Sequence, residues 1–235
     1  MTDGALLAGS EDPPVRRVRW RSAVRIIPSR FPPVNLFERV ADVADFEALY
    51  EVEARTNPRL RDEVGEIELV PRAERVFGPG SSYIMASFTH LHPAGGRFND
   101  RAFGAWYGAR ERATAVAETS FHRARFLAAT AEGPFSFDMR VLEARLDARL
   151  HDLRGAVLPL IYDPSDYSAG QQLARRLRGV GSAGIAFSSV RRPGGECVAV
   201  YRPRVLSECR QAEHLVYYWD GSTITRVVEQ RAYRP

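Results

Sequence analysis

The middle of the chain reads Gly95-Gly96-Arg97-Phe98-Asn99, then Trp106-Tyr107-Gly108, and then Thr114-Ala115-Val116-Ala117-Glu118. The pattern predicts two short strands followed by the first turn of a helix. An arginine, a tyrosine and a glutamate therefore come close together in the sequence. Because a guanidinium forms paired hydrogen bonds with phosphate oxygens, Arg97 is suited to hold a diphosphate.

The other two side chains complete a possible NAD site. The flat ring of Tyr107 can stack on a heteroaromatic group and attract a cationic pyridinium. The carboxylate of Glu118 can orient a ribose hydroxyl and stabilise positive charge at an anomeric carbon, as carboxylates do in glycosidases. An ordinary structural interpretation competes with this one: a Gly-Gly-Arg turn, a packed strand tyrosine, and a surface glutamate paired with His122. Residue types alone leave both open.

A wider set of motifs resembles the RES domain family, which is named for an arginine, a glutamate and a serine. The matching segments are Gly96-Arg97-Phe98-Asn99, Ala105-Trp106-Tyr107, Thr114-Ala115-Val116-Ala117-Glu118 and Gly184-Ile185-Ala186-Phe187-Ser188-Ser189-Val190-Arg191. The resemblance runs from roughly Gly78 to Gly221. By this alignment Ser189 is the family serine; Ser188, in a position where the family often has proline, is the alternative.

The resemblance implies an α+β fold similar to ADP-ribosyltransferase toxins, with a mixed, mostly antiparallel sheet and surrounding helices. It also implies NAD as substrate, destroyed by hydrolysis or phosphorolysis or used to ADP-ribosylate a protein, and a helix-turn-helix antitoxin of the Xre type as partner. Arg97 would clamp the diphosphate, Tyr107 and Glu118 would lie at the nicotinamide and its ribose, and Ser189 would bond a phosphate or ribose. The resemblance leaves the acceptor of ADP-ribose open.

The amino-acid composition limits which classes of function remain possible. The 235 residues are 45% hydrophobic and 26% charged, which is ordinary for a globular protein. The net charge is only +4, and all 33 basic residues are arginine because the sequence contains no lysine. We therefore expect no direct nucleic-acid binding, although the stretch Arg16–Arg21, expected to be a solvated N-terminal arm, could touch phosphates. A non-catalytic module that binds a nucleotide or a protein is the other alternative.

The sequence shows no signal for export, membrane insertion or metal binding. No apolar run is long enough to span a membrane and the N-terminus lacks the charge of a signal peptide, so we expect a cytoplasmic protein. Cys197 and Cys209 are expected to be reduced and structural. His90 and His92 could share one face of a strand, but further ligands are lacking, so no metal is predicted.

The chain is predicted to comprise a flexible tail at 1–14, a helical extension at 15–75 packed on the core, and a catalytic domain at 76–235. Within the extension, the helix expected after Phe31-Pro32-Pro33 ends at Asn57-Pro58. The sequence does not decide whether the protein forms a homo-oligomer.

The catalytic domain is predicted to contain seven further elements besides the Trp106-Tyr107 strand and the helix after Thr114. Strands are expected at 83–88, 135–141, 183–187, 197–201 and 214–219, and a helix at 171–178. Asp220-Gly221 predicts a hairpin that leads into a returning strand at 222–228. The helix after Thr114 is expected to bury a stripe of side chains at 117, 121, 124 and 128.

Overall fold

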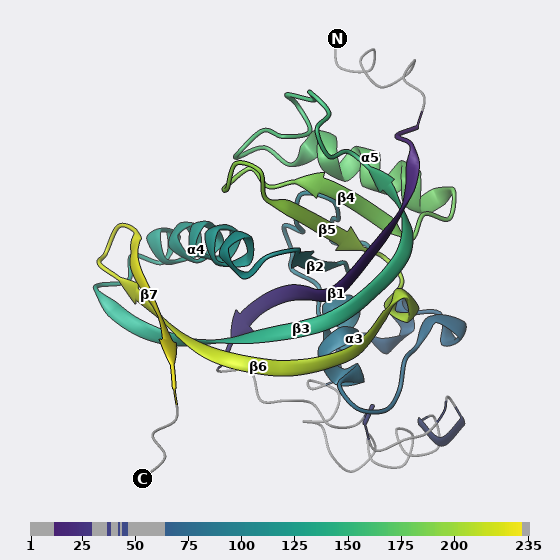
Figure 1. Ribbon diagram of the computed structural model, residues 1–235, viewed down its shortest axis with the longest axis horizontal. Coiled ribbons are helices and arrows are strands. Elements are labelled where there is room, and N and C mark those ends of the chain that lie inside the picture. The colour runs from purple at the N-terminus through teal and green to yellow at the C-terminus, as the bar shows by residue number, and fades with distance from the viewer. Residues whose placement is uncertain (1–11, 30–36, 39–41, 43, 47–63, 232–235) are drawn as a thin grey trace.

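The computed structural model describes residues 12–29, 37–38, 42, 44–46 and 64–231, shown as ribbons in Figure 1. Its strands are β1 (Val15–Pro28), β2 (Trp106–Ala109), β3 (Phe135–Asp152), β4 (Gly184–Ser188), β5 (Glu196–Val200), β6 (Leu206–Trp219) and β7 (Ile224–Gln230). Its longer helices are α3 (Ser81–Thr89), α4 (Arg112–Ala129) and α5 (Ser168–Gly179). Short 3-10 helices are η1 (Ile67–Leu69), η2 (Arg72–Glu74) and η3 (Pro203–Val205).

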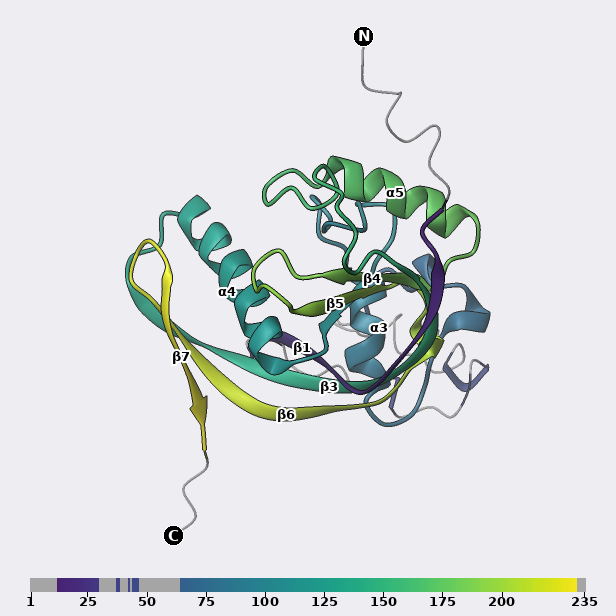
Figure 2. The ribbon, with the colours of Figure 1, turned by 45° about the horizontal axis from the view of Figure 1, so that its top comes forward.

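All seven strands belong to one mixed sheet with the order β1-β2-β5-β4-β3-β6-β7. An additional pairing of β1 with β3 closes the first five strands of this order into a ring. Of the pairings between described strands, β3 with β4 is parallel and the rest are antiparallel. The long strands β1, β3 and β6 curve around the shorter β2, β4 and β5 (Figures 1 and 2). The predicted α+β class with a mostly antiparallel sheet is confirmed.

The inner strands are buried on both faces. In β5, Val198 and Val200 contribute to one hydrophobic cluster, whereas Cys197 and Ala199 contribute to the other. This follows from the alternation of side chains along a strand. Helix α3 belongs to the first cluster and α5 to the second, so strands β2, β4 and β5 lie between two packed layers. Their ends can therefore position a site.

Residues 81–89 form helix α3, so the strand predicted at 83–88 is wrong. Seven of the nine residues of α3 are buried, which leaves no polar face to reveal a helical period. Gly80 precedes the helix in a left-handed conformation, with φ of 78°. A side chain there would collide with the backbone of Cys209 on β6. The helix begins where glycine permits this close approach.

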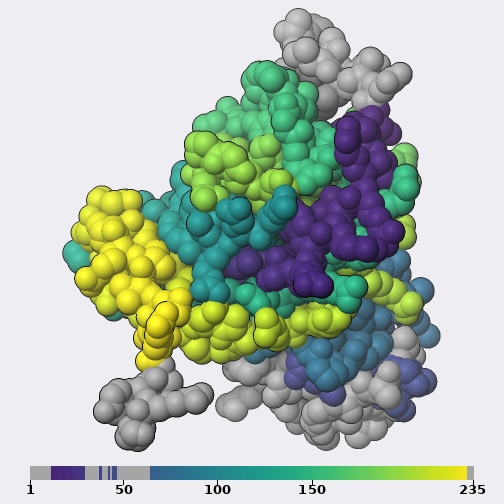
Figure 3. Space-filling model, viewed as in Figure 1, coloured from purple at the N-terminus to yellow at the C-terminus, as the bar shows by residue number. Residues whose placement is uncertain are grey.

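Residues 15–28 form strand β1, so the solvated arm expected at Arg16–Arg21 and the helical character expected from residue 15 are both wrong here. Strand β1 pairs along its length with β3, and Val18 and Trp20 are buried. Arg17 and Arg19 alternate with them and share Asp147 at 2.8 and 3.0 Å. Side chains of β1 reach the surface in the space-filling view (Figure 3).

The remainder of the predicted extension is only partly described. The helix expected between residues 31 and 57 lies mostly outside the described residues, although 44–46 are helical. The tail predicted at 1–14 lies outside them up to residue 11. The division of the chain at residue 75 stays a prediction.

The other predicted elements of the core are confirmed as strands β2 to β7 and helices α4 and α5. At the predicted hairpin, Asp220 Oδ1 accepts hydrogen bonds from the amides of Ser222 and Thr223, both at 2.8 Å. The buried stripe expected on α4 is wrong, because its buried residues are Thr114, Ala115 and Leu127. The middle of α4 is thus half-exposed, and Glu118 lies there. No helix within the described ranges is long and apolar enough to cross a membrane.

Candidate active site

Arg97 lies in a tight turn, and the first of the two short strands predicted for this stretch is reduced to a single bridge between Gly96 and Asn99. The amide of Gly96 donates to the backbone oxygen of Asn99 at 2.9 Å and to its Oδ1 at 3.1 Å. A Cβ atom on Gly96 would lie 2.6 Å from the hydroxyl of Tyr107. Glycine is therefore required for the turn to pack against β2.

The hydroxyl of Tyr107 fastens this turn to the sheet. It donates to Asn99 Oδ1 at 2.7 Å and accepts from the amide of Phe98 at 2.8 Å. Burial raises the pKa of Tyr107, so the hydroxyl keeps its proton. Asn99 also donates to the backbone oxygen of Phe103 at 3.1 Å. The sequence did not single out Asn99 for this role, because an asparagine in a turn carries no sign of its partners.

We expect Tyr107→Phe to lower the free energy of unfolding by about 1–3 kcal/mol, because it leaves the part-buried Phe98 amide without its acceptor and removes one of the two donors to Asn99 Oδ1. Urea denaturation measures this loss. Tyr218→Phe is the control, since the Tyr218 hydroxyl makes no hydrogen bond within the described part of the chain. Equal destabilisation by the two variants would contradict the fastening role.

Arg97 is buried, with 7% of its surface exposed, yet only part of its guanidinium is engaged. Nη1 donates to the backbone oxygens of Ile161 and Asp163, at 2.7 and 2.6 Å. Nε and Nη2 meet no acceptor among the described residues. The Tyr167 ring centroid lies 4.6 Å from Cζ, a cation–π distance. Burial lowers the pKa of Arg97, but an arginine stays charged at neutral pH.

Glu118 and Ser189 are in direct contact, although they are far apart in the sequence. The Ser189 hydroxyl donates to Glu118 Oε1 at 2.6 Å and accepts from the amides of Arg191 and Arg192, each at 3.1 Å. Ser188 Oγ instead accepts from the amide of Gly155 at 3.2 Å. Of the two candidate serines, Ser189 is therefore the one that contacts Glu118, and the loop after β4 holds its hydroxyl in place.

Arginines dominate the electrostatics around Glu118. The pKa of Arg97 is raised by Glu118 and lowered by Arg191, which indicates that these charges share one site. Cζ of Arg191 lies 3.3 Å from the centroid of the Phe121 ring, and Cζ of Arg125 lies 6.0 Å from that of Tyr167. An excess of guanidinium groups around Glu118 suits a polyanionic ligand.

The structure thus brings Ser189 into contact with Glu118 and places Arg97 within electrostatic range of that carboxylate. Tyr167 and Arg191 also lie at the site, and the sequence did not single them out. Arg191 is the last residue of the final segment that resembles the family, so its position in the sequence could have indicated a role in the site. Tyr167 only follows a polar turn that begins at Asp163. Nothing in the sequence indicated that its ring would cover Arg97.

His122 titrates abnormally in this site. Burial and the neighbouring arginines lower its pKa to about 4, and its Nε2 lies 4.0 Å from Glu118 Oε2. An unfolded histidine has a pKa of about 6.5. Between pH 6.5 and pH 4 the unfolded chain therefore binds the proton first, and stability falls as the pH is lowered through this window.

We expect His122→Gln to remove about 1 kcal/mol of this pH dependence, a small value because the half-exposed side chain is screened by solvent. Urea denaturation of both proteins at pH 7 and pH 4.5 gives the difference. Parallel pH profiles of the two proteins would contradict the lowered pKa of His122.

The described residues contain no group of three or more His, Cys, Asp or Glu side chains that could hold a metal ion. His90 lies at the end of α3, and both it and His92 are exposed. Cys197 and Cys209 are free and buried. Burial raises the pKa of Cys209 to about 12, so it is a poor nucleophile at neutral pH.

Comparisons with known proteins match this chain to one family over most of the region described above. The model of the RES domain matches residues 72–220. The uncharacterized protein y4oC of Sinorhizobium fredii is 36% identical over 206 residues, which cover 86% of this chain and 84% of the relative. A similarity also exists to a chain in the crystal structure of the M. tuberculosis MbcT-MbcA toxin-antitoxin complex. It has 14% identity and a TM-score of 0.38, and covers 59% of this chain and 73% of that one. The chain belongs to the RES domain family.

Proposed function

We propose that this protein cleaves the bond between nicotinamide and ribose in NAD and passes the ADP-ribose unit to water or phosphate. The observation that carries the proposal is a buried arginine with unused donors that lies within electrostatic range of a carboxylate bonded by Ser189. The RES resemblance, which implies an ADP-ribosyltransferase-like core and NAD as substrate, supports it. The same resemblance supports a role as the toxin of a pair whose antitoxin has an Xre-type helix-turn-helix.

Arg97 would bind the diphosphate through Nε and Nη2. Its Nη1 is already anchored on the backbone of Ile161 and Asp163, so the remaining donors are held in a fixed direction. A preorganised guanidinium loses little entropy when it binds phosphate oxygens. The ring of Tyr167, half-buried beside Arg97, offers an aromatic face for a ring of the substrate.

Glu118 would accept a hydrogen bond from the nicotinamide ribose and stabilise the positive charge that develops at C1′. The bond from C1′ to the pyridinium nitrogen breaks, and its electron pair stays on that nitrogen, so nicotinamide leaves neutral. An oxygen of water or phosphate then bonds to C1′. With water as acceptor, one proton is released to solvent.

Ser189 and Tyr107 would act as positioning residues. The Ser189 hydroxyl, predicted to bond a phosphate or ribose, is directed at Glu118 and fixes one of its oxygens. Tyr107, predicted to stack on the nicotinamide, has its hydroxyl committed to the turn that carries Arg97. Its contribution to substrate binding therefore passes through that turn.

We expect Ser189→Ala to lower kcat about 10- to 100-fold, because Glu118 loses its orienting donor. Ser188→Ala is the matched control, since its hydroxyl contacts the amide of Gly155 and not Glu118. Nicotinamide release at saturating NAD measures both variants. Equal kcat values for the two would contradict the positioning role of Ser189.

Product analysis tests the proposed reaction and identifies the acceptor. The purified protein is incubated with NAD in buffer with or without inorganic phosphate. The products are separated by chromatography and identified by mass spectrometry. We expect ADP-ribose without phosphate, or a phosphorylated ADP-ribose with it, together with an equal amount of nicotinamide. Unchanged NAD in all reactions of the folded protein would overturn the proposal.

A further inference from the structure

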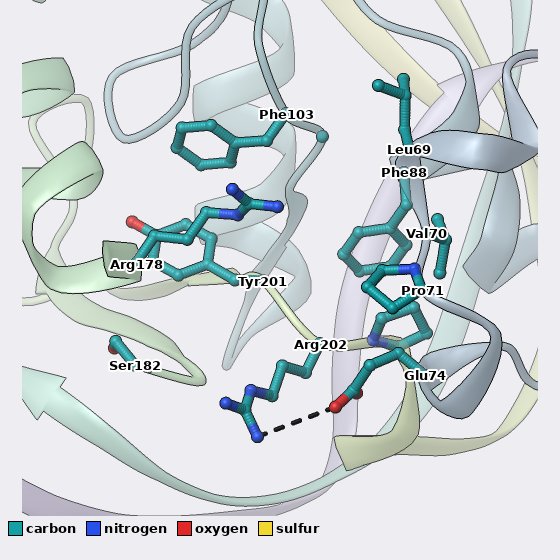
Figure 4. Close-up of a pocket in the computed structure, with 12 residues that line it drawn as sticks. Leu69, Val70, Pro71, Glu74, Phe88, Phe103, Arg178, Ser182, Tyr201 and Arg202 are labelled. Atoms are coloured by element: carbon teal, nitrogen blue, oxygen red, sulfur yellow. Dashed lines mark ion pairs between the residues drawn. The ribbon is translucent and has the colours of Figure 1, made fainter. Parts of the chain in front are cut away.

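A second pocket, of about 290 Å³, shares no lining residue with the site around Arg97 and Glu118. Phe103, Tyr201 and Arg178 line one side, and Leu69, Val70 and Phe88 line the other (Figure 4). Its volume is near the lower limit of about 300 Å³ for small-molecule sites. The pocket is therefore large enough for a single-ring compound.

Arg178 carries a positive charge that no described carboxylate neutralises. Its Cζ lies 4.7 Å from the centroid of the Phe103 ring, and Figure 4 shows its nitrogen atoms directed toward the side of Phe88. Its neighbours on α5 are paired, Arg175 with Asp100 and Arg176 with Asp12. The Arg178 guanidinium makes no hydrogen bond or ion pair with any described residue.

The remaining charges of the pocket cancel each other. Arg202 and Glu74 form an ion pair at 3.7 Å, drawn as a dashed line in Figure 4. Arg202 also donates to the backbone oxygen of Gly181 at 2.9 Å. One net positive charge therefore remains, next to aromatic and aliphatic walls. This combination favours a ligand with one negative charge and a flat apolar body.

We propose that this pocket is a second binding site, for a small planar monoanion of the aromatic carboxylate class. The carboxylate bonds to the guanidinium of Arg178, and the ring of the ligand lies between the Phe103–Tyr201 side and the Phe88 side. A guanidinium already held against an aromatic ring is preorganised for such a pair.

The pocket is connected to the turn that carries Arg97. The Tyr201 hydroxyl donates to the backbone oxygen of Phe98 at 3.0 Å. The backbone oxygen of Phe103 accepts from Asn99 Nδ2 at 3.1 Å. A ligand that immobilises Phe103 and Tyr201 also steadies this turn. We expect slower hydrogen exchange at the amide of Phe98 when the pocket is occupied.

The test uses benzoate as probe and benzyl alcohol as its neutral counterpart, titrated into the full chain and followed by nuclear magnetic resonance. We expect benzoate to bind, and to bind about tenfold or more tightly than benzyl alcohol, since a hydrogen bond to a charged group contributes about 1.5–3 kcal/mol. In Arg178→Gln this preference should be lost. Arg176→Gln, on the same helix, should keep it.

Two outcomes would overturn the proposal: no binding of benzoate at any concentration, or equal affinity of benzoate for the wild-type protein and Arg178→Gln. In the second case, displacement of benzoate by NAD would place benzoate in the Arg97–Glu118 site. Binding of benzoate does not require cleavage of NAD. This test therefore gives a result even if the proposed NAD cleavage is not observed.

Discussion

Glu118→Gln is expected to lower kcat/KM for nicotinamide release from NAD by roughly 10²- to 10³-fold. Glutamine has nearly the same shape, and its amide oxygen can still accept the hydrogen bond of Ser189. It lacks the negative charge that would stabilise the cation at C1′. Because the packing of α4 is unchanged, we expect the free energy of unfolding to stay close to that of the wild-type protein.

Glu132→Gln provides the matched control. Glu132 follows the end of α4 and is exposed, so the same loss of one carboxylate should leave the rate unchanged. Initial rates of nicotinamide release and urea denaturation are measured for all three proteins. A folded Glu118→Gln variant with wild-type kcat/KM would rule out the role assigned to this carboxylate.

Arg97→Lys is expected to lower the free energy of unfolding by about 2–4 kcal/mol and to abolish detectable binding of NAD. A lysine ammonium cannot reproduce the planar fork that bonds Ile161 and Asp163 and lies against the Tyr167 ring. The backbone oxygens of Ile161 and Asp163 would lose a buried donor. The variant would also lack Nε and Nη2, which are the donors proposed to bind the diphosphate.

Arg101→Lys is the control for this prediction, because Arg101 is exposed and lies four residues further along the same loop. Calorimetric titration with NAD and urea denaturation compare the two variants. If Arg97→Lys kept wild-type stability and affinity, the guanidinium would have neither the structural nor the binding role argued here.

Periodicity predicted the fold well where one face of an element is polar. The strand around Phe137 and the helix around Gln171 follow this rule, and both are present. It failed for α3, whose buried faces leave no helical period. Strand β1 was missed although Arg17, Val18, Arg19 and Trp20 alternate with the period of a strand, because the run of arginines was interpreted as a solvated arm. Pairing with β3 is a long-range contact, and the alternation does not identify the partner strand.

The sequence indicated which residues form the candidate site better than it indicated the contacts between them. Arg97, Glu118 and Ser189 carry sequence motifs, and the structure brings Ser189 onto Glu118. The Tyr107 hydroxyl donates to Asn99 Oδ1, and the spacing of residues along the sequence does not predict this side-chain contact. The position of Tyr167 over Arg97 depends on how the loop before α5 packs. Such contacts arise from tertiary structure alone.

The central claim is that the Arg97–Glu118 site cleaves NAD, and nicotinamide release by the purified protein tests it most directly. NAD and nicotinamide are quantified by chromatography over time for the wild-type protein and for Glu118→Gln. We predict that the wild-type protein consumes NAD and releases an equal amount of nicotinamide, and that the folded variant does so at least 100-fold more slowly. Intact NAD with the wild-type protein, or equal rates for both proteins, would contradict the account.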